Sequence, residues 1–269
     1  MSEPFEDIRY EVADHVATVT FARPDKLNAF RARTMRDFVA ALDEIDADDD
    51  VRAVVVTGAG DAFCAGAEMS RADTFDAPER VEFTSSPVRP PASQVRKPVI
   101  AAVNGHAIGI GLTLAMQCDI RIMATGAKYA FVHVRRGVLP DAHSHWTVPR
   151  AIGFARTAEL FLTGRLFTAD EAVAIGLASR ALAPADVLPA ALELARDIAV
   201  HTAPLSVALS KWLLWSTSPL GADETDALET AMHLAVMGRV DAREGILSFV
   251  ENREPRWRLS PTRDWPEWA

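Results

Sequence analysis

Two segments of small residues, each following an apolar run, are the first places in the sequence where chemistry is expected. They read CAGA at residues 64–67 and NGHAIGIG at residues 104–111. Small residues let a ligand come close to the backbone, so that main-chain N–H and C=O groups can bind it. The second segment leads into a predicted helix, whose first N–H groups lack intrahelical acceptors and suit an oxyanion. For the first segment alone, a tight packing corner between a strand and a helix is an equally good interpretation.

Side chains that could transfer protons are concentrated between residues 132 and 150. This segment holds His133, Asp141, His143 and His145. Histidine and carboxylate side chains serve as general acids and bases in enzymes. Asp141 could instead cap a helix that begins near Ser144, and His143 and His145 are better explained as surface or interface residues. All four are of zinc-ligand types, but the sequence does not define their geometry, and we expect no metal site.

Several other kinds of site lack their defining motifs. No G-x-G-x-x-G and no G-K-[ST] occurs, which disfavours nucleotide-fold dehydrogenases and ATPases. A G-x-S-x-G nucleophile elbow is also missing, so a serine hydrolase is not expected. The net charge of −9 disfavours nucleic acid as a partner, because binding to phosphate backbones needs an excess of Lys and Arg.

Cysteine content and hydropathy indicate the compartment. Two cysteines are too few for a disulfide framework and fit a reducing cytoplasm. The acidic N-terminus does not resemble a secretory or mitochondrial leader. No apolar run approaches the roughly 20 residues that span a bilayer. We therefore expect a soluble cytoplasmic protein with no membrane partner.

Strand and helix patterns alternate through the first two-thirds of the chain. Alternating β-branched residues around Asp14-His15 predict a hairpin. Continuous apolar runs predict strands buried on both faces at residues 51–58, 97–105 and 119–125. Three capping boxes predict helix starts: Thr34 with Asp37, Thr168 with Glu171, and Asp241 with Glu244.

The chain then divides into two regions. Residues 74–94 lack periodicity and contain several prolines, which predicts a mobile loop. From residue 184 onward only helical spacing occurs. We expect an α/β core over residues 1–200 and a helical C-terminal region over residues 201–269.

Taken together, the two small-residue segments resemble those of the enoyl-CoA hydratase/isomerase (crotonase) superfamily. Its members carry a CAGAD-type turn after a strand and a KPVIAAVNG-x-A-x-G-x-G helix at this spacing. Residues 23–30, RPDKLNAF, are similar to its RP-x-x-x-NA element, and residues 162–182 resemble its TG-x-x-x-x-A-x-EA-x-x-x-GL-V segment. The resemblance covers about residues 5 to 257.

The resemblance implies a crotonase-like spiral of β-β-α turns, followed by a helical C-terminal trimerisation region. By motif position, the N–H groups of Ala67 and Ile110 would donate to the thioester carbonyl oxygen of an acyl-CoA and stabilise its enolate. The implied CoA-binding residues are Lys26, Ala29, Ala65, Gly66, Ala67, Glu68 and Ile110. CoA enters as part of the substrate, so no separate cofactor is implied. The expected assembly is a homotrimer or a dimer of trimers.

The sequence departs from the family at its catalytic positions. Hydratases of the family use two glutamates, but here Thr113 and His133 stand in their places. Isomerases carry one carboxylate after the residue matching Pro140, where this chain has Asp141, one methylene shorter than Glu. His133 also resembles the histidine that works with an aspartate in the carbon–carbon hydrolases of the superfamily. We expect Asp141 to be the principal acid/base residue and His133 to have a secondary role.

Three functions remain open from the sequence. The leading interpretation is an enzyme of fatty-acid metabolism that isomerises or hydrates an enoyl-CoA. The second is a His/Asp-dependent hydrolase of a diketone or a CoA thioester, and the third is a CoA-binding or RNA-binding protein without catalysis. Thr113 favours the third, whereas Asp141 and both small-residue segments argue against it. The acyl chain cannot be read, because residues 74–94, expected to shape its pocket, have no recognisable pattern.

Overall fold

The computed structural model describes residues 5–69, 84–217 and 220–267. Strands and helices alternate as far as residue 182, and helices follow. The strands are β1 (Ile8–Ala13), β2 (Val16–Phe21), β3 (Ala53–Gly58), β4 (Ala62–Cys64), β5 (Val99–Val103), β6 (His106–Ile108), β7 (Ile120–Ala124), β8 (Tyr129–Ala130) and β9 (Arg180–Leu182). The helices are α1 (Ala32–Ala47), α2 (Ile110–Ala115), α3 (Ser144–Ile152), α4 (Phe154–Thr163), α5 (Ala169–Ala174), α6 (Pro184–His201), α7 (Pro204–Ser216), α8 (Ala222–Val236) and α9 (Val240–Glu251), with short 3-10 helices η1 (Pro24–Lys26), η3 (Ala92–Gln94) and η4 (Val132–Arg136).

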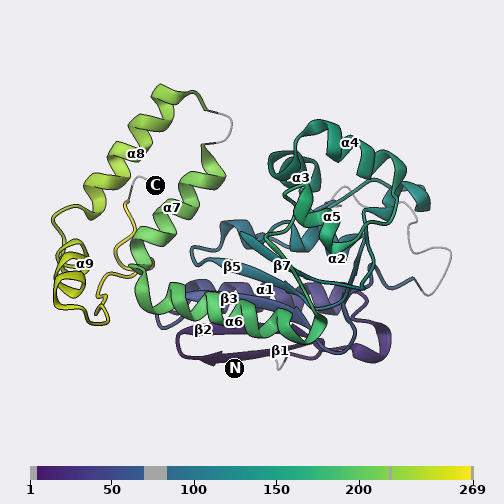
Figure 1. The fold of residues 1–269 in the computed structure, drawn as a ribbon, viewed down its shortest axis with the longest axis horizontal. Helices are drawn as coiled ribbons and strands as arrows, with labels where there is room; N and C mark the ends of the chain where they lie inside the picture. The colour runs from purple at the N-terminus through teal and green to yellow at the C-terminus, as the bar shows by residue number, and fades with distance from the viewer. Residues whose placement is uncertain (1–4, 70–83, 218–219, 268–269) are drawn as a thin grey trace.

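The strands form two sheets that the chain visits in turn (Figure 1). The larger sheet has the order β1-β2-β3-β5-β7-β9, and the smaller has the order β4-β6-β8. β1 and β2 are antiparallel, and Asp14 and His15 turn between them with φ angles of 51° and 63°, which confirms the predicted hairpin. The remaining pairs within these sheets are parallel. Each of β3, β5 and β7 is followed by a strand of the smaller sheet, and this repetition confirms the predicted spiral.

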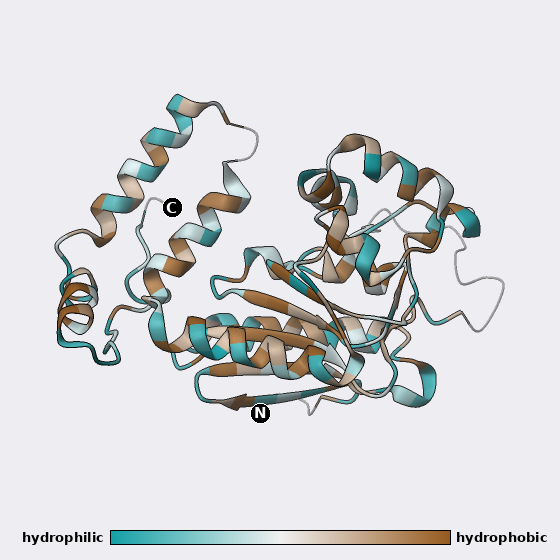
Figure 2. Cartoon of the chain, in the orientation of Figure 1, coloured by the Kyte–Doolittle hydropathy of each residue, from teal (hydrophilic) through white to brown (hydrophobic). Residues whose placement is uncertain are grey.

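The central strands of the larger sheet, β3 and β5, are buried on both faces, which explains the continuous apolar runs in their sequence. On one face, α6 packs on β3, β5 and β7 through Val187, Ala191, Ala195 and Ala199. Alanine every fourth residue gives the helix a flat stripe that can approach the strands closely. The other face packs against α1, α2 and the smaller sheet. In Figure 2 these strands are coloured mostly as hydrophobic, as expected where both faces are covered.

The three predicted capping boxes had different outcomes. The box of Asp241 with Glu244 was wrong, because α9 begins at Val240 and its N-cap Arg239 makes no side-chain cap bond. Thr168 caps α5 as predicted, because its hydroxyl accepts from the Glu171 N–H at 3.2 Å. The box at the start of α1 was wrong, since that helix begins at Ala32. Asp37 is used elsewhere: its carboxylate accepts from the N–H groups of Glu6 and Asp7, both at 2.8 Å. The Asp37 side chain, which the local pattern had assigned to the helix start, therefore binds residues about 30 positions away in the sequence.

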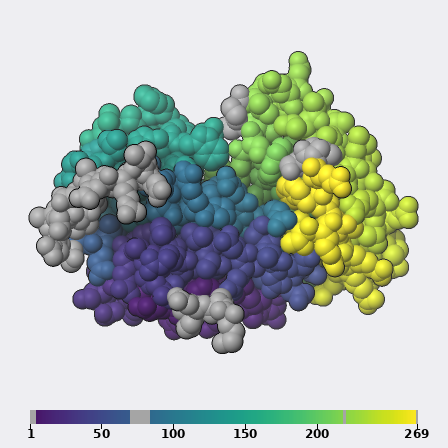
Figure 3. All heavy atoms as spheres, turned by 180° about the vertical axis from the view of Figure 1, so that it is seen from behind, coloured from purple at the N-terminus to yellow at the C-terminus, as the bar shows by residue number. Residues whose placement is uncertain are grey.

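The C-terminal helices α7, α8 and α9 stand at one end of the larger sheet (Figures 1 and 3). Leu205, Leu209 and Met232 form a small apolar cluster among them. The proposed division at residue 200 falls in the last turn of α6, and it stays a prediction. None of the helices in the described ranges is long and apolar enough to cross a membrane. Of the segment expected to be a loop, residues 74–83 lie outside the described residues.

Candidate active site

The first candidate oxyanion donor is the N–H of Ala67, on the segment after β4. Phe30 pairs with this segment on both sides of Ala67: its N–H donates to Gly66 O at 2.8 Å, and its carbonyl accepts from Glu68 N at 2.9 Å. Gly66 has φ +109°, and a Cβ there would lie 3.1 Å from Ile108 O, so glycine is required. The pairing leaves the Ala67 N–H without an acceptor among the described residues.

The second candidate donor is the N–H of Ile110, the first residue of α2. Gly109 turns the chain into the helix with φ +56°, and its own N–H donates to Ala130 O at 3.0 Å. The Ile110 N–H finds no acceptor in the part of the chain that the structure describes, as expected for a first helical residue. A Cβ on Gly111 would lie 2.1 Å from Cys64 O, so α2 packs directly on the β4 segment. The two small-residue segments are therefore adjacent, although about 40 residues separate them in the sequence.

Asp141 lies in a turn that two other segments hold in place. The Ala142 N–H donates to Ser85 O at 2.9 Å, and the Gln117 side chain donates to Ala142 O at 3.0 Å. Ala142 and His143 both have left-handed φ angles, so the backbone reverses just before α3.

The Asp141 carboxylate meets Thr113, 28 residues away in the sequence, and His133, which lies in the same segment. The Thr113 hydroxyl donates to Asp141 Oδ1 at 2.6 Å. His133 Nε2 lies 3.4 Å from the same oxygen, without hydrogen-bond alignment. The interpretation of Asp141 as a helix cap is not supported, because α3 has His143 as its N-cap and no side-chain cap bond. The structure thus brings together Thr113, His133 and Asp141.

His133 is buried beside the second donor. Its side chain is only 8% exposed, and neither ring nitrogen has a hydrogen-bond partner among the described residues. A Cβ built on Gly109 would lie 3.7 Å from His133 Nε2, which places the ring against the residue preceding Ile110. A buried polar group without a partner costs free energy, and such groups are characteristic of functional sites.

The other two histidines of this segment lie elsewhere. The His143 ring is 3.2 Å from the Ser86 hydroxyl, and burial, together with the Arg89 charge, lowers its pKa. His145 is exposed and packs edge-on against Phe161. No group of three or more metal-ligating side chains comes together within the described ranges.

Cys64 is a buried thiol between the two donor segments. Burial raises its pKa to about 12, with a smaller contribution from the negative charge of Asp141. The thiol is therefore protonated and not nucleophilic at neutral pH.

The residues implied for CoA binding lie on two paired segments. Lys26 is exposed at the end of η1, and Ala65 N donates to Leu27 O at 3.0 Å. Glu68 is not free, because Arg23 donates to its carboxylate at 3.0 Å and to Ala29 O at 2.7 Å. The Arg23 hydrogen bond also lowers the pKa of Glu68.

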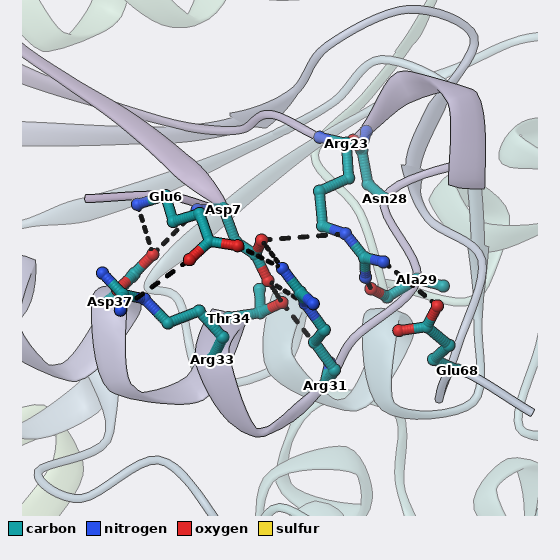
Figure 4. A network of polar contacts seen from close by, with 10 residues as sticks. All are labelled: Glu6, Asp7, Arg23, Asn28, Ala29, Arg31, Arg33, Thr34, Asp37 and Glu68. Carbon is teal, nitrogen blue, oxygen red and sulfur yellow. Dashed lines mark hydrogen bonds and ion pairs between the residues drawn. The ribbon is translucent and has the colours of Figure 1, made fainter.

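Arg23 belongs to a set of charged side chains that we call the Asp7 network (Figure 4). Its members are Glu6, Asp7, Arg23, Arg31, Arg33, Thr34, Asp37 and Glu68. Sequence analysis missed this network and the contact between Thr113 and Asp141. No local signal could have found them, since Thr113 and Asp141 are 28 residues apart and Arg23 and Glu68 are 45 apart.

Comparison with known proteins agrees with this geometry. The family model described as enoyl-CoA hydratase/isomerase matches residues 11–260. Enoyl-CoA hydratase AFT3-1 of Alternaria alternata is 37% identical over 256 residues, covering 91% of this chain and 84% of that protein. Short-chain-enoyl-CoA hydratase of Clostridium acetobutylicum is 34% identical over 242 residues, covering 89% and 92%.

Two solved structures are similar over most of the chain. A crystal structure described as a probable enoyl-CoA hydratase/isomerase from Mycobacterium abscessus has a TM-score of 0.91 and 50% identity, covering 93% of this chain and 98% of that one. The enoyl-CoA hydratase from Bacillus anthracis has a TM-score of 0.88 and 30% identity, covering 94% and 99%.

Proposed function

Because the chain belongs to the enoyl-CoA hydratase/isomerase family and is an acyl-CoA enzyme, we propose that it moves a proton at the carbon next to the thioester of an enoyl-CoA. The thioester oxygen accepts from the N–H groups of Ala67 and Ile110. Asp141 takes and returns the proton, and His133 has a secondary, orienting role. The overall reaction is double-bond isomerisation or hydration in fatty-acid metabolism.

The observation that carries this proposal is the pair of unbonded N–H groups on adjacent segments. Removing a proton beside a thioester places negative charge on the carbonyl oxygen, and fixed donors lower the energy of that state more than that of the ground state. Each of the two N–H groups is left without an acceptor among the described residues, although Glu68 N beside the first and Gly109 N beside the second are hydrogen-bonded. Donors in this condition are available to a ligand without breaking the fold.

The second support is the Asp141 carboxylate, which Thr113 bonds from the helix that begins at Ile110. Asp141 is partly exposed, at 26%, so a substrate can reach it, whereas His133 is buried beside it. The two-glutamate mechanism of the hydratases is not supported, because Thr113 and His133 occupy the positions of the two glutamates. We therefore assign proton transfer to one carboxylate, as in the isomerases that the sequence resembles.

Substrate binding and assembly follow from the same assignment. Lys26, Ala29 and residues 65–68 line the path of CoA, and no separate cofactor takes part. We also propose a homotrimer or a dimer of trimers, supported by exposed apolar side chains on α8 and α9 such as Leu234, Ile246 and Phe249. Light scattering that reports a monomer at working concentration would contradict the assembly.

Calorimetric titration with acetyl-CoA and longer acyl-CoAs tests the binding, and assays with 2-enoyl-CoA and 3-enoyl-CoA test the reaction. Measurable heat and turnover of either enoyl-CoA are expected. No heat with any acyl-CoA, and no stabilisation against unfolding, would overturn the proposal.

A further inference from the structure

Thr113 is completely buried, and its hydroxyl lies between the two parts of the proposed active site. Its Oγ1 is 2.6 Å from Asp141 Oδ1 and 3.2 Å from the carbonyl oxygen of Ile110. Ile110 is the residue whose N–H is the second oxyanion donor. One hydroxyl therefore contacts both the proposed base and the residue that carries a donor.

The hydroxyl has one hydrogen to donate, and the two acceptors differ in strength. A charged carboxylate oxygen at 2.6 Å is a stronger acceptor than a backbone carbonyl at 3.2 Å. The contact with Ile110 O is the ordinary interaction of a threonine with the preceding helical turn. The hydrogen is thus directed to Asp141 Oδ1.

The two oxygens of Asp141 are consequently different. Oδ1 accepts from Thr113 and also faces His133 Nε2 at 3.4 Å. Oδ2 makes no hydrogen bond or ion pair with the described residues. Oδ2 is the oxygen left unbonded for a substrate.

Helix α2 connects the carboxylate to the oxyanion donor. Ile110 is its first residue and Thr113 its fourth, so the helix fixes their separation. The thioester oxygen and the acidic carbon belong to one small rigid group of the substrate. An error of 1 Å in such an arrangement can lower a rate by about 10²-fold.

We propose that Thr113 is a positioning residue that holds Oδ1 of Asp141 and leaves Oδ2 as the atom that takes the proton. In that step the C–H bond next to the thioester breaks, its electron pair forms the enolate, and the proton binds to Oδ2. The reverse step returns it to carbon. This inference rests on the proposed function. It assigns a function to Thr113, which otherwise only marks the absence of a hydratase glutamate.

Hydrogen exchange on a saturated substrate tests the inference independently of the overall reaction. Butyryl-CoA is incubated with the protein in D₂O, and loss of the C2 hydrogens is followed by NMR. Thr113→Val keeps the shape of the side chain but removes the hydroxyl, whereas Thr113→Ser keeps the hydroxyl. Thr157→Val is the matched control, because buried Thr157 donates to Gly153 O at 2.8 Å and makes no hydrogen bond to a carboxylate within the described ranges.

We expect Thr113→Val to slow exchange by about tenfold or more, while the dissociation constant for butyryl-CoA stays within about twofold. Thr113→Ser should stay within about threefold of the wild-type rate, and Thr157→Val should be unchanged in exchange. If Thr113→Val does not fold, Thr113→Ala replaces it in the same comparison with Thr113→Ser.

The possible failures are distinguishable. Undiminished exchange in the variant without a hydroxyl overturns the role of Thr113 alone. Equally slow exchange in Thr113→Ser also overturns it, because the hydroxyl would then not be what matters. A wild-type protein that neither exchanges these hydrogens nor turns over any enoyl-CoA overturns the proposed function and this inference with it.

Discussion

Two aspartates of this protein, Asp7 and Asp141, differ in how completely their carboxylates are paired. Asp7 accepts from Arg31 at 2.7 and 2.8 Å and from Thr34 at 2.6 Å, and Arg23 lies 3.7 Å away (Figure 4). Asp141 accepts one hydroxyl bond, and its neighbour His133 has no hydrogen bond among the described residues.

This difference in pairing distinguishes a carboxylate that stabilises the fold from one that can act on a substrate. A carboxylate bonded on all sides is fixed and has no capacity left for a ligand, so it contributes stability. A carboxylate with one free oxygen beside a buried imidazole keeps that capacity, which is typical of functional sites. The two regions meet at Glu68, whose carboxylate belongs to the Asp7 network and whose N–H neighbours the Ala67 donor.

The largest expected effect is from Ala67→Pro. Proline removes an N–H that the fold does not use, so kcat should fall by about 10²- to 10³-fold, or about 2.7–4 kcal/mol. The stability should change little. Rates and circular dichroism are measured on the same preparation.

Ala65→Pro is the matched control two residues away. The Ala65 N–H donates to Leu27 O at 3.0 Å, so its loss should destabilise the fold. Near-normal turnover in a folded Ala67→Pro variant would refute the donor assignment.

Asp7→Asn should lower the free energy of unfolding by about 3 kcal/mol, the lower end for breaking a buried ion pair, because Arg31 is partly exposed. Catalysis in the remaining folded protein should change far less. Denaturant unfolding at neutral pH gives the first quantity. An Asp7→Asn variant as stable as the wild type would contradict the stabilising role of Asp7.

The same carboxylate predicts a dependence of stability on pH. Burial alone would raise the pKa of Asp7, but hydrogen bonds from Arg31 and Thr34 and the nearby Arg23 charge lower it overall. Its stabilising contribution is therefore present above the unfolded value of 3.8 and is lost as the pH falls through the lower folded value. The free energy of unfolding, measured from pH 6 to pH 2, should decrease in the wild type and should decrease less in Asp7→Asn.

Asp141→Asn applies the same substitution to the incompletely paired site. If Asp141 is the base, kcat should fall by at least about 10²-fold, or about 2.7 kcal/mol. The stability should decrease less than in Asp7→Asn, because Asp141 is partly exposed and makes fewer bonds. Unchanged rates on enoyl-CoA would contradict the assignment.

His133→Gln should have the smallest effect, about tenfold or less in kcat, because the ring is proposed to orient and not to transfer the proton. It is assayed beside Asp141→Asn under identical conditions. A larger loss from His133→Gln than from Asp141→Asn would favour His-dependent hydrolysis over isomerisation or hydration.

The sequence by itself determined the elements and the two donor segments. Alternating β-branched residues predicted the hairpin at Asp14-His15, and continuous apolar runs predicted strands of the buried sheet. Gly109 follows from its local φ of +56°, whereas Gly66 and Gly111 also face the backbone of the other donor segment, at Ile108 O and Cys64 O. The hairpin, the buried strands and Gly109 depend on neighbours in the chain or on the burial of one whole run.

Only the tertiary structure decided which polar side chains meet. Asp37 resembles part of a helix cap locally, yet the N–H groups of Glu6 and Asp7 take its carboxylate. Thr113 occupies the position of a hydratase glutamate, yet its hydroxyl donates to Asp141, 28 residues away. The energy of a hydrogen bond depends on distance and angle between two groups, and those are set where the spiral brings separate turns together. The residue type determines what a side chain can bind, and the tertiary structure determines which partner lies within reach.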